Sequence, residues 1–455
     1  MSQTVSVQGS EEPATRTLPS VAVVAMVGFV IMSGLLQPRL VVPGLGAAGR
    51  PAALFALFML VLWSFTRLLP AEHNDGSTRL RRSLVVYFLI FLAAMAAGID
   101  RGLPGIEQRS MDRAFLVTLG FGAVILIAEE GLRTIDEVER VLSWAVAVGA
   151  IGAIVGVIQF IGLDLSAYIR LPGLTLNSPP SEILTRGAVQ YRRVRGLTLH
   201  PIEYGVHLAM LLPVALHLAM TRPDWTRLRW FAVALLAAGI PLSISRSGVL
   251  ALAVAMGVYV IGFTWRQRAN AAVLAVVGTM AFMIVTPGLL GTIRSLFLNA
   301  SNDNSVAGRT GDYGVVGDLI SERPLLGRGP GTYIPEEYRT LDNQYLATLL
   351  ESGWLGLGAL LLVVATAIGT AVRLTRRSIT PRLRSLTRAL GAGVAVAPVV
   401  FATFDALGHP VFAGTLVVMI GCLAALDRLT SGGDRTAGDA HATTPTARTS
   451  SAVQP

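Results

Sequence analysis

The sequence has no lysine, a single cysteine and few charged residues of either sign. All 37 basic residues are arginines, and only 14% of the 455 residues are charged. The lone Cys422 lies inside an apolar run, so neither a disulfide framework nor a thiolate metal site can form from this chain alone. With 53% hydrophobic residues, the chain has more apolar surface than one water-soluble domain could bury. We therefore expect lipid to be its main solvent.

Several functional motifs are absent as well. The six histidines show no spacing typical of metal ligands, and there is no Gly-x-Ser-x-Gly segment. The sequence therefore predicts no metal, no cofactor and no hydrolase chemistry. The net charge is +9, but the arginines lie in short clusters between apolar runs. Such clusters are typical of membrane topology signals and anion contacts, and we expect no nucleic-acid partner.

Apolar runs long enough to cross a membrane fill most of the chain. A helix needs about 20 residues to span a hydrocarbon core of about 30 Å. The sequence predicts an all-α polytopic membrane protein with about 12 transmembrane helices, and the closeness of the seventh and eighth runs leaves ten or eleven open. The expected runs are 20–37, 51–69, 83–99, 114–128, 141–162, 202–220, 228–243, 248–265, 271–290, 346–372, 386–407 and 410–426.

The arginines also predict the orientation of the helices in the cell membrane. The short loops on one side hold only Arg39, Arg50, Arg101, Arg109, Arg113 and Arg246, and the loops on the other side hold many more. Cytoplasmic loops carry the excess of basic residues, so we expect the N-terminus inside. Two longer loops, about 163–201 and 291–345, then face outward, and function is expected there.

Both ends of the chain are expected to be polar tails around one transmembrane domain. Residues 1–19 include two acids but no basic segment before a cleavage motif, which predicts a retained cytoplasmic tail and no cleaved targeting peptide. The transmembrane domain is expected over 20–429. Residues 430–455 are rich in Thr, Ser, Ala, Gly and Pro, which predicts a disordered cytoplasmic tail.

Basic side chains crowd the end of the first outer loop. Arg192, Arg193 and Arg195 come just before His200 and Glu203, where a helix enters the membrane. Because the guanidinium fork binds two oxygens at once, this cationic mouth suits a phosphate or pyrophosphate. Contact with lipid headgroups is an equal alternative for Arg192 and Arg193. Arg195 is followed by a glycine that permits close backbone approach, and it is the better functional candidate.

Two more arginines lie close to the expected membrane surface. Arg246 lies between two apolar runs with almost no aqueous loop, where a charge is costly unless it is paired or used. An arginine that snorkels from a helix end is the alternative. Arg309, in the second outer loop, precedes a predicted short amphipathic helix with Tyr313, Val316, Leu319 and Ile320 on one side.

The second outer loop ends in a glycine-rich segment and two polar residues. The segment 322–332 looks like a phosphate cradle, but no strand precedes it and no Lys-Ser/Thr follows, so a glycine-rich turn is predicted. Asp342 and Asn343 then come directly before a membrane helix. A helix cap is one interpretation of Asp342. A general base that faces the arginine-rich mouth is the other.

These motifs together resemble the O-antigen ligase and Wzy-type polymerase family over about residues 194–361. At the position of Asp342-Asn343, the family usually has His followed by Asn. Here Asp342 takes the position of that His, which favours a polymerase over a ligase. The matching elements are Arg195-Gly196, His200-Pro201, Ser245-Arg246-Ser247-Gly248, Arg309, the segment 323–331, and Asp342-Asn343 before Gly353.

The resemblance implies a glycosyltransferase of the C type that inverts the anomeric carbon without a metal. Its donor would be a glycan on undecaprenyl pyrophosphate at the outer face, and its acceptor a hydroxyl of a glycan or glycolipid. Asp342 would be the acceptor-activating base, oriented by Asn343, and Arg195 and Arg246 would stabilise the leaving pyrophosphate. Membrane lipids and a chain-length regulator are the other partners it suggests. The remaining substrate contacts would be Arg309, Arg193, His200, Arg323 and Arg328.

Two other classes of protein stay open. A transporter or flippase of lipid-linked glycans fits the helix count and Arg246, although transporters usually show internal repeats and polar sites at mid-membrane. The chain shows no repeat of 20 to 50 residues, and its polar residues collect in two loops. A peptidoglycan glycosyltransferase of the shape, elongation and division type has a similar helix count, but its motifs are not found.

Overall fold

Almost all regular structure in the chain is helical, as the sequence predicts. The computed structural model describes residues 20–68, 78–165, 171–177, 185–186, 191–285, 316–335, 337–338 and 340–442. Two short antiparallel strand pairs are the other elements there, and the first of them ties the 163–201 loop to the connection after α1. They are β1 (Leu40–Val41) with β2 (Thr175–Leu176) and β3 (Thr185–Arg186) with β4 (Tyr191–Arg192).

The described part of the chain contains twelve α-helices of 14 to 34 residues, and each overlaps one predicted apolar run. Seven of them (α3, α4, α5, α6, α12, α13 and α14) are long and apolar enough to cross a membrane, so twelve crossings stay a prediction. The helices are α1 (Val21–Gly34), α2 (Pro51–Leu68), α3 (Arg79–Asp100), α4 (Gly105–Gly131), α5 (Ile135–Phe160), α6 (Pro201–Thr221), α7 (Thr226–Leu242), α8 (Arg246–Val260), α9 (Trp265–Val285), α12 (Gln344–Arg377), α13 (Pro381–Val400) and α14 (Pro410–Ala442).

Two further predictions, the end of the transmembrane domain and a short amphipathic helix, can be compared with the structure. Helix α14 continues to Ala442, past the end of the transmembrane domain expected at 429, and residues 443–455 lie outside the described part. Residues 316–322 are helical, and Val316, Leu319 and Ile320 pack together against the start of α12. This confirms the short amphipathic helix from Val316 on, and Tyr313 lies outside the described residues.

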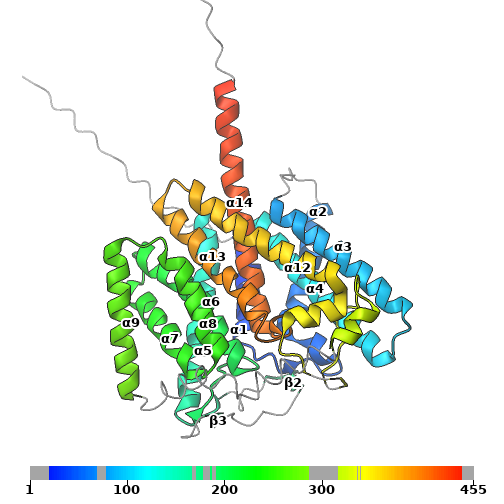
Figure 1. Ribbon diagram of the computed structural model, residues 1–455. Helices are drawn as coiled ribbons and strands as arrows, with labels where there is room; N and C mark the ends of the chain where they lie inside the picture. The colour runs from blue at the N-terminus through cyan, green and yellow to red at the C-terminus, as the bar shows by residue number, and fades with distance from the viewer. Residues whose placement is uncertain are drawn as a thin grey trace, which may run out of the picture.

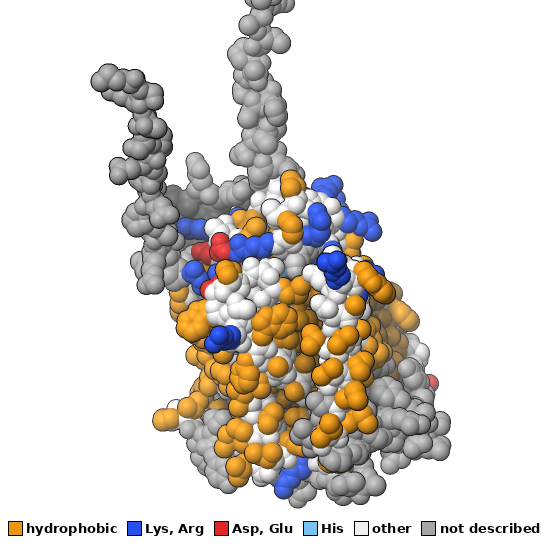
Figure 2. Space-filling model, turned by 90° about the vertical axis from the view of Figure 1, so that its left-hand side faces the viewer, with side chains coloured by type: hydrophobic (Ala, Val, Ile, Leu, Met, Phe, Trp, Pro, Cys, Tyr) orange, Lys and Arg blue, Asp and Glu red, His pale blue; other side chains and the backbone are white. Residues whose placement is uncertain are grey.

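The helices run between two ends of the bundle (Figure 1). At the arginine end lie the last turns of α2, α4, α6, α12 and α14. At the loop end lie the segments 191–200, 243–245, 323–343 and 401–409. Figure 2 shows arginines gathered toward the arginine end above a band of hydrophobic side chains. The side of the membrane that each end faces stays a prediction.

Helices α6 and α14 form the centre of the bundle. Most side chains of α6 and of the Pro410–Ser431 part of α14 are buried. Helix α9 lies at the edge (Figure 1), and its apolar side chains, such as Leu274 and Ile284, are mostly exposed. An apolar face without protein cover fits contact with lipid, where a helix satisfies its own backbone hydrogen bonds.

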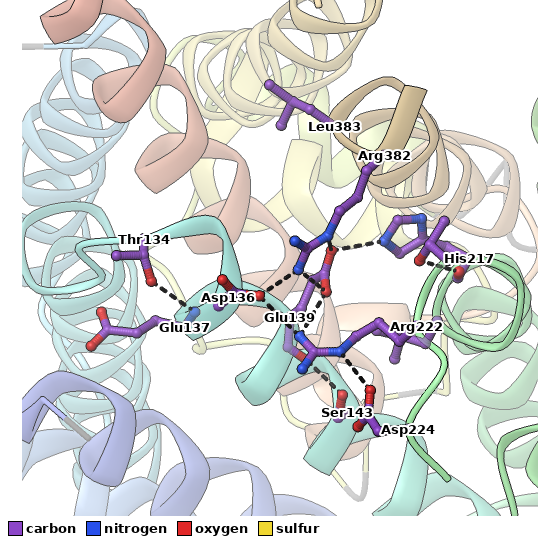
Figure 3. A network of polar contacts seen from close by, with 12 residues as sticks. Thr134, Asp136, Glu137, Glu139, Ser143, His217, Arg222, Asp224, Arg382 and Leu383 are labelled. Carbon is purple, nitrogen blue, oxygen red and sulfur yellow. Dashed lines mark hydrogen bonds and ion pairs between the residues drawn. The ribbon is translucent and has the colours of Figure 1, made fainter. Parts of the chain in front are cut away.

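A buried carboxylate joins four segments at the arginine end (Figure 3). The side chain of Glu139 in α5 is fully buried, and Arg382 in α13 donates to both of its oxygens, at 2.8 and 2.7 Å. Arg222, just after α6, donates to it at 3.0 Å, and His217 Nε2 lies 3.3 Å away. Pairing with two guanidinium groups explains how a charge is tolerated in the core.

We expect Glu139→Ala to destabilise the fold far more than Asp136→Ala. Asp136 pairs with the same Arg382 at 2.5 Å, but its side chain is 62% exposed. Removing one partner of a buried ion pair leaves charges uncompensated and costs about 3 kcal/mol, whereas an exposed pair contributes about 1 kcal/mol or less. Thermal unfolding of the purified variants in detergent measures the difference. Equal melting temperatures for the two variants would contradict this role of Glu139.

Candidate functional site

Arg195 is held at the loop end by contacts around Gln159 of α5. Gln159 Oε1 accepts the backbone N–H groups of Arg195 (3.1 Å) and Gly196 (2.9 Å), and its amide donates to Asp164 at 3.0 Å. Asp164 Oδ2 lies 3.3 Å from Arg195 Nη2. Gly196 has a φ of +54° and packs against the Tyr204 ring, so no side chain fits there. The Arg195 side chain is therefore buried in a fixed position.

Arg246 begins α8 directly after a strained turn. Ile244 in this turn has a φ of +46°, a conformation that a β-branched residue rarely adopts. Ser245 is the N-cap of α8. The side chain of Arg193 reaches the same turn, where its Nε donates to the Ser243 carbonyl at 3.3 Å. The structure thus brings the segment that carries Arg193 and Arg195 beside the start of α8.

Two glycines let α6 and α8 approach closely near this turn. A Cβ on Gly205 would lie 2.6 Å from Ser243 Oγ and 3.3 Å from the Cα of Gly248. Contacts this short leave no room for a larger residue at position 205. The first turn of α6 is therefore closely packed against the start of α8.

Glu203 connects the first turns of α6 and α14. Its buried carboxylate accepts the N–H groups of Val411 (2.7 Å), Phe412 (3.2 Å) and Leu199 (2.9 Å). The first N–H groups of a helix have no partner within the helix, and a negative charge there is favourable. Glu203 therefore has a structural role.

His200 is a neutral helix cap. Its Nδ1 accepts the N–H of Ile202 at 3.2 Å, which makes it the N-cap of α6. Burial, followed by the charges of Arg193, His409 and Arg195, lowers the pKa of His200 to about 3. It therefore carries no charge at neutral pH, and its expected part in substrate binding stays a prediction.

The loop 401–409 lies between the starts of α6 and α12. Gln344, the first residue of α12, donates its backbone N–H to the Phe401 carbonyl at 2.8 Å. Its side-chain Oε1 accepts the N–H of Leu407, also at 2.8 Å. On the other side, the ring of His409 lies 6.3 Å from that of His200. The loop is therefore docked on both helices.

Asp405 and His409 form a pair within this loop. His409 Nδ1 lies 3.1 Å from the Asp405 carbonyl and 3.5 Å from its Oδ1. A carbonyl only accepts, so Nδ1 carries the proton and Nε2 is left as an acceptor. Burial raises the pKa of the Asp405 carboxyl, His409 opposes the rise, and the charges of Asp342 and Glu203 add to it. The pair therefore lies within electrostatic reach of Asp342.

The structure gives different positions to Asp342 and Asn343. Asn343 is the cap of α12, because its Oδ1 accepts the N–H groups of Tyr345 (3.0 Å) and Leu346 (3.3 Å). The cap interpretation of Asp342 is therefore wrong. Asp342 is half-buried and makes no hydrogen bond or ion pair with any residue that the structure describes. Its carboxylate is open to a ligand.

The glycine-rich segment 323–331 is a turn, as predicted, and it fills a break in α12. The break is at Gly353, which has a φ of +63°, and a Cβ there would overlap the Leu325 carbonyl. The backbone groups freed by the break are satisfied by the turn. The two segments share four backbone hydrogen bonds of 2.8 to 3.2 Å, from Trp354 to Pro324, Leu355 to Leu325, Arg328 to Leu350 and Gly329 to Glu351.

The arginines of this turn already have protein partners. Arg323 Nη1 donates to the Ala97 carbonyl of α3 at 3.3 Å. Arg328 Nη2 lies 3.3 Å from Glu107 of α4 and donates to the Tyr338 hydroxyl at 2.7 Å. Both arginines fasten the turn to the bundle, and their expected substrate contacts stay predictions. Arg309, another expected contact, lies outside the described residues.

The family comparison covers the centre of this site. Residues 231–361 match the family model described as O-antigen ligase. This part of the chain is similar to the O-antigen ligase family. The match confirms the resemblance, and the O-antigen ligase region contains Arg246, the broken helix and Asp342. Arg193, Arg195 and His200 precede it. A comparison with curated proteins finds no match.

The loop 401–409, which lies beyond the O-antigen ligase region, was not predicted as part of the site. One signal for it was present in the sequence. His200-Pro201 and His409-Pro410 are two His-Pro pairs, and each pair begins a helix. Because proline is favoured in the first helical position, the second pair marks a helix start, and the structure places it near the first, with the two histidine rings 6.3 Å apart.

We expect Gly353→Ala to disrupt the site and Gly358→Ala to be tolerated. A Cβ at Gly353 must displace the backbone of the turn, and alanine is strained at its positive φ. Gly358 lies on the same helix, and a Cβ there would meet no atom within 4 Å. Thermal unfolding should show a loss above about 1 kcal/mol for the first variant only. Similar stability of both would mean that the break is not required.

Proposed function

We propose that this protein is a membrane glycosyltransferase of cell-surface polysaccharide synthesis. It transfers a glycan from an undecaprenyl-pyrophosphate donor to a sugar hydroxyl at the outer face of the membrane. One observation carries this proposal. Arginines and a carboxylate that is open to a ligand lie at the same end of the bundle, and the O-antigen ligase region contains part of this site. The arginines come from segments around α6 and α8, and Asp342 stands at the start of α12.

The arginines suit the leaving group of such a reaction. The acceptor oxygen bonds to the anomeric carbon while the bond from that carbon to the pyrophosphate oxygen breaks. The lipid pyrophosphate leaves with that electron pair, and preorganised cations stabilise its growing charge. Arg195 is fixed by Gln159 and Asp164 before substrate arrives, which removes the cost of ordering it. We assign the leaving group to Arg195 and Arg246, with Arg309 third.

Removal of the proton from the acceptor hydroxyl requires a base on the side of the anomeric carbon that is opposite the leaving pyrophosphate. Asp342 can accept a hydrogen bond from the acceptor hydroxyl, but an ordinary aspartate is a weaker base than histidine at neutral pH. His409 supplies the stronger base, because its Nδ1 is held by Asp405 and its Nε2 is left as an acceptor. We therefore assign orientation of the hydroxyl to Asp342 and removal of its proton to His409.

A polymerase is favoured over a ligase, and a flippase is the alternative. Asp342 in place of the family's usual histidine supports the polymerase. A flippase needs polar groups along a path through the membrane. The groups described above collect instead at one end of the bundle, as expected for chemistry at a membrane surface.

Deletion of the gene, followed by sizing of the surface glycan, tests the function. Loss of long chains with short units retained is the result expected for a polymerase, and loss of attachment alone would indicate a ligase. Purified protein in vesicles with lipid-linked oligosaccharide should lengthen the glycan. Transfer of the lipid between leaflets at unchanged chain length would identify a flippase.

The same lengthening assay tests the site residues. Arg246→Ala should lose about 100- to 1,000-fold in rate, as removal of one charge-stabilising donor does. Full activity of Arg246→Lys would show that charge alone suffices. Asp342→Asn should retain part of the rate that Asp342→Ala loses, because the amide still orients a hydroxyl. Arg376→Ala, at the far end of α12, is the matched control. An Asp342→Ala rate close to the parent would remove Asp342 from the mechanism.

We expect His409→Ala to lose about 100- to 10,000-fold in rate, the usual contribution of a general base. Added imidazole should restore part of this rate, because it can occupy the vacated space and accept the proton. His200→Ala is the control, since His200 is a neutral cap whose loss imidazole should not repair. Failure of imidazole to rescue a folded His409→Ala variant would assign His409 a structural role only.

A further inference from the structure

A second candidate site lies at the arginine end, away from the residues assigned to glycan transfer. A cavity of about 390 Å³ separates α3 from α12, two helices that pack side by side (Figure 1). Ligand pockets typically have volumes of about 300 to 1,000 Å³. A Cβ on Gly369, which lines the cavity, would meet no atom within 4 Å, so the space beside it is open.

Three arginines surround this cavity, and none of its described lining residues is acidic. Arg79 and Arg82 come from α3, and Arg373 from α12. The first two are exposed and make no hydrogen bond or ion pair with the residues that the structure describes. Arg373 gives one hydrogen bond of 2.7 Å to Asp427. The cavity mouth thus holds more positive charge than the described residues neutralise, which favours an anion.

The inner part of the cavity is less polar. Ser83, Thr366 and Thr370 add hydroxyl groups near the arginines. Val86 follows on α3, about 10 Å along the helix from Arg79. It is 40% exposed, and Leu362 of α12 is 44% exposed. A ligand held by the arginines would therefore continue over an apolar wall that opens toward lipid.

We propose that this cavity binds an anionic phospholipid, with the phosphate among the three arginines and an acyl chain along Val86 and Leu362. The apolar wall favours a lipid over free phosphate, which needs only the charged mouth. Guanidinium forks bind two phosphate oxygens at once, and basic pockets between helices are known to hold lipid headgroups. A bound lipid would brace α3 against α12, the helix whose other end begins beside Asp342.

Native mass spectrometry of the purified protein tests this site. We expect phosphatidylglycerol to stay bound at least about tenfold more tightly than phosphatidylcholine, since each arginine near an anionic headgroup adds attraction. The double variant Arg79→Gln/Arg82→Gln should lose this preference. Arg376→Gln/Arg377→Gln is the matched control, because it removes the same charge from the same end outside the cavity.

Two further measurements distinguish a phospholipid in the cavity from free phosphate and from lipid held by the basic surface as a whole. Gly369→Leu should fill the cavity and weaken lipid binding while every arginine is kept. Competition by millimolar inorganic phosphate, with no effect of Gly369→Leu, would identify free phosphate as the ligand and overturn the proposal. Equal loss of lipid in both double variants would also overturn it, because the attraction would then belong to the whole basic surface.

Discussion

A charge held between apolar helices is stable only where protein or ligand atoms pair with it, and this constraint governs both ends of the molecule. Glu139 is paired by Arg382 and Arg222, and Glu203 by backbone N–H groups at the start of α14. Arg195 is paired by Asp164. Asp342 has no such partner among the residues that the structure describes. The simplest explanation is that a substrate supplies the partner.

The break in helix α12 also leaves polar groups that need partners, and these partners fix the direction of the helix. A continuous helix from Gln344 would satisfy its own backbone there, whereas the break at Gly353 exposes backbone groups that the turn 323–331 satisfies. Arg323 and Arg328 then join the turn to α3 and α4. The direction of the first half of α12, and with it the position of Asp342, therefore depends on the contacts of this turn with α3 and α4.

The helices could be predicted because apolar runs and turn residues are local signals, and each of the twelve runs corresponds to a described helix. Within the site, the neighbourhood of Arg193 and Arg246 could be anticipated, but the partners of Arg323 and Arg328 could not. Those partners, Ala97 and Glu107, lie more than 200 residues away in sequence. His409 was missed for the same reason, since only tertiary packing brings the loop 401–409 to Asp342.

The arrangement of charge also bears on the proposed stereochemistry. Arg193, Arg195 and Arg246 belong to segments around α5, α6 and α8, whereas Asp342, Asp405 and His409 belong to the starts of α12 and α14. The pyrophosphate of the proposed donor would be repelled by the carboxylates, so in the proposed reaction it would lie on the arginine side of the site. The proposed acceptor hydroxyl would then approach from the carboxylate side. Attack and departure on opposite faces of the anomeric carbon is the geometry that inversion requires.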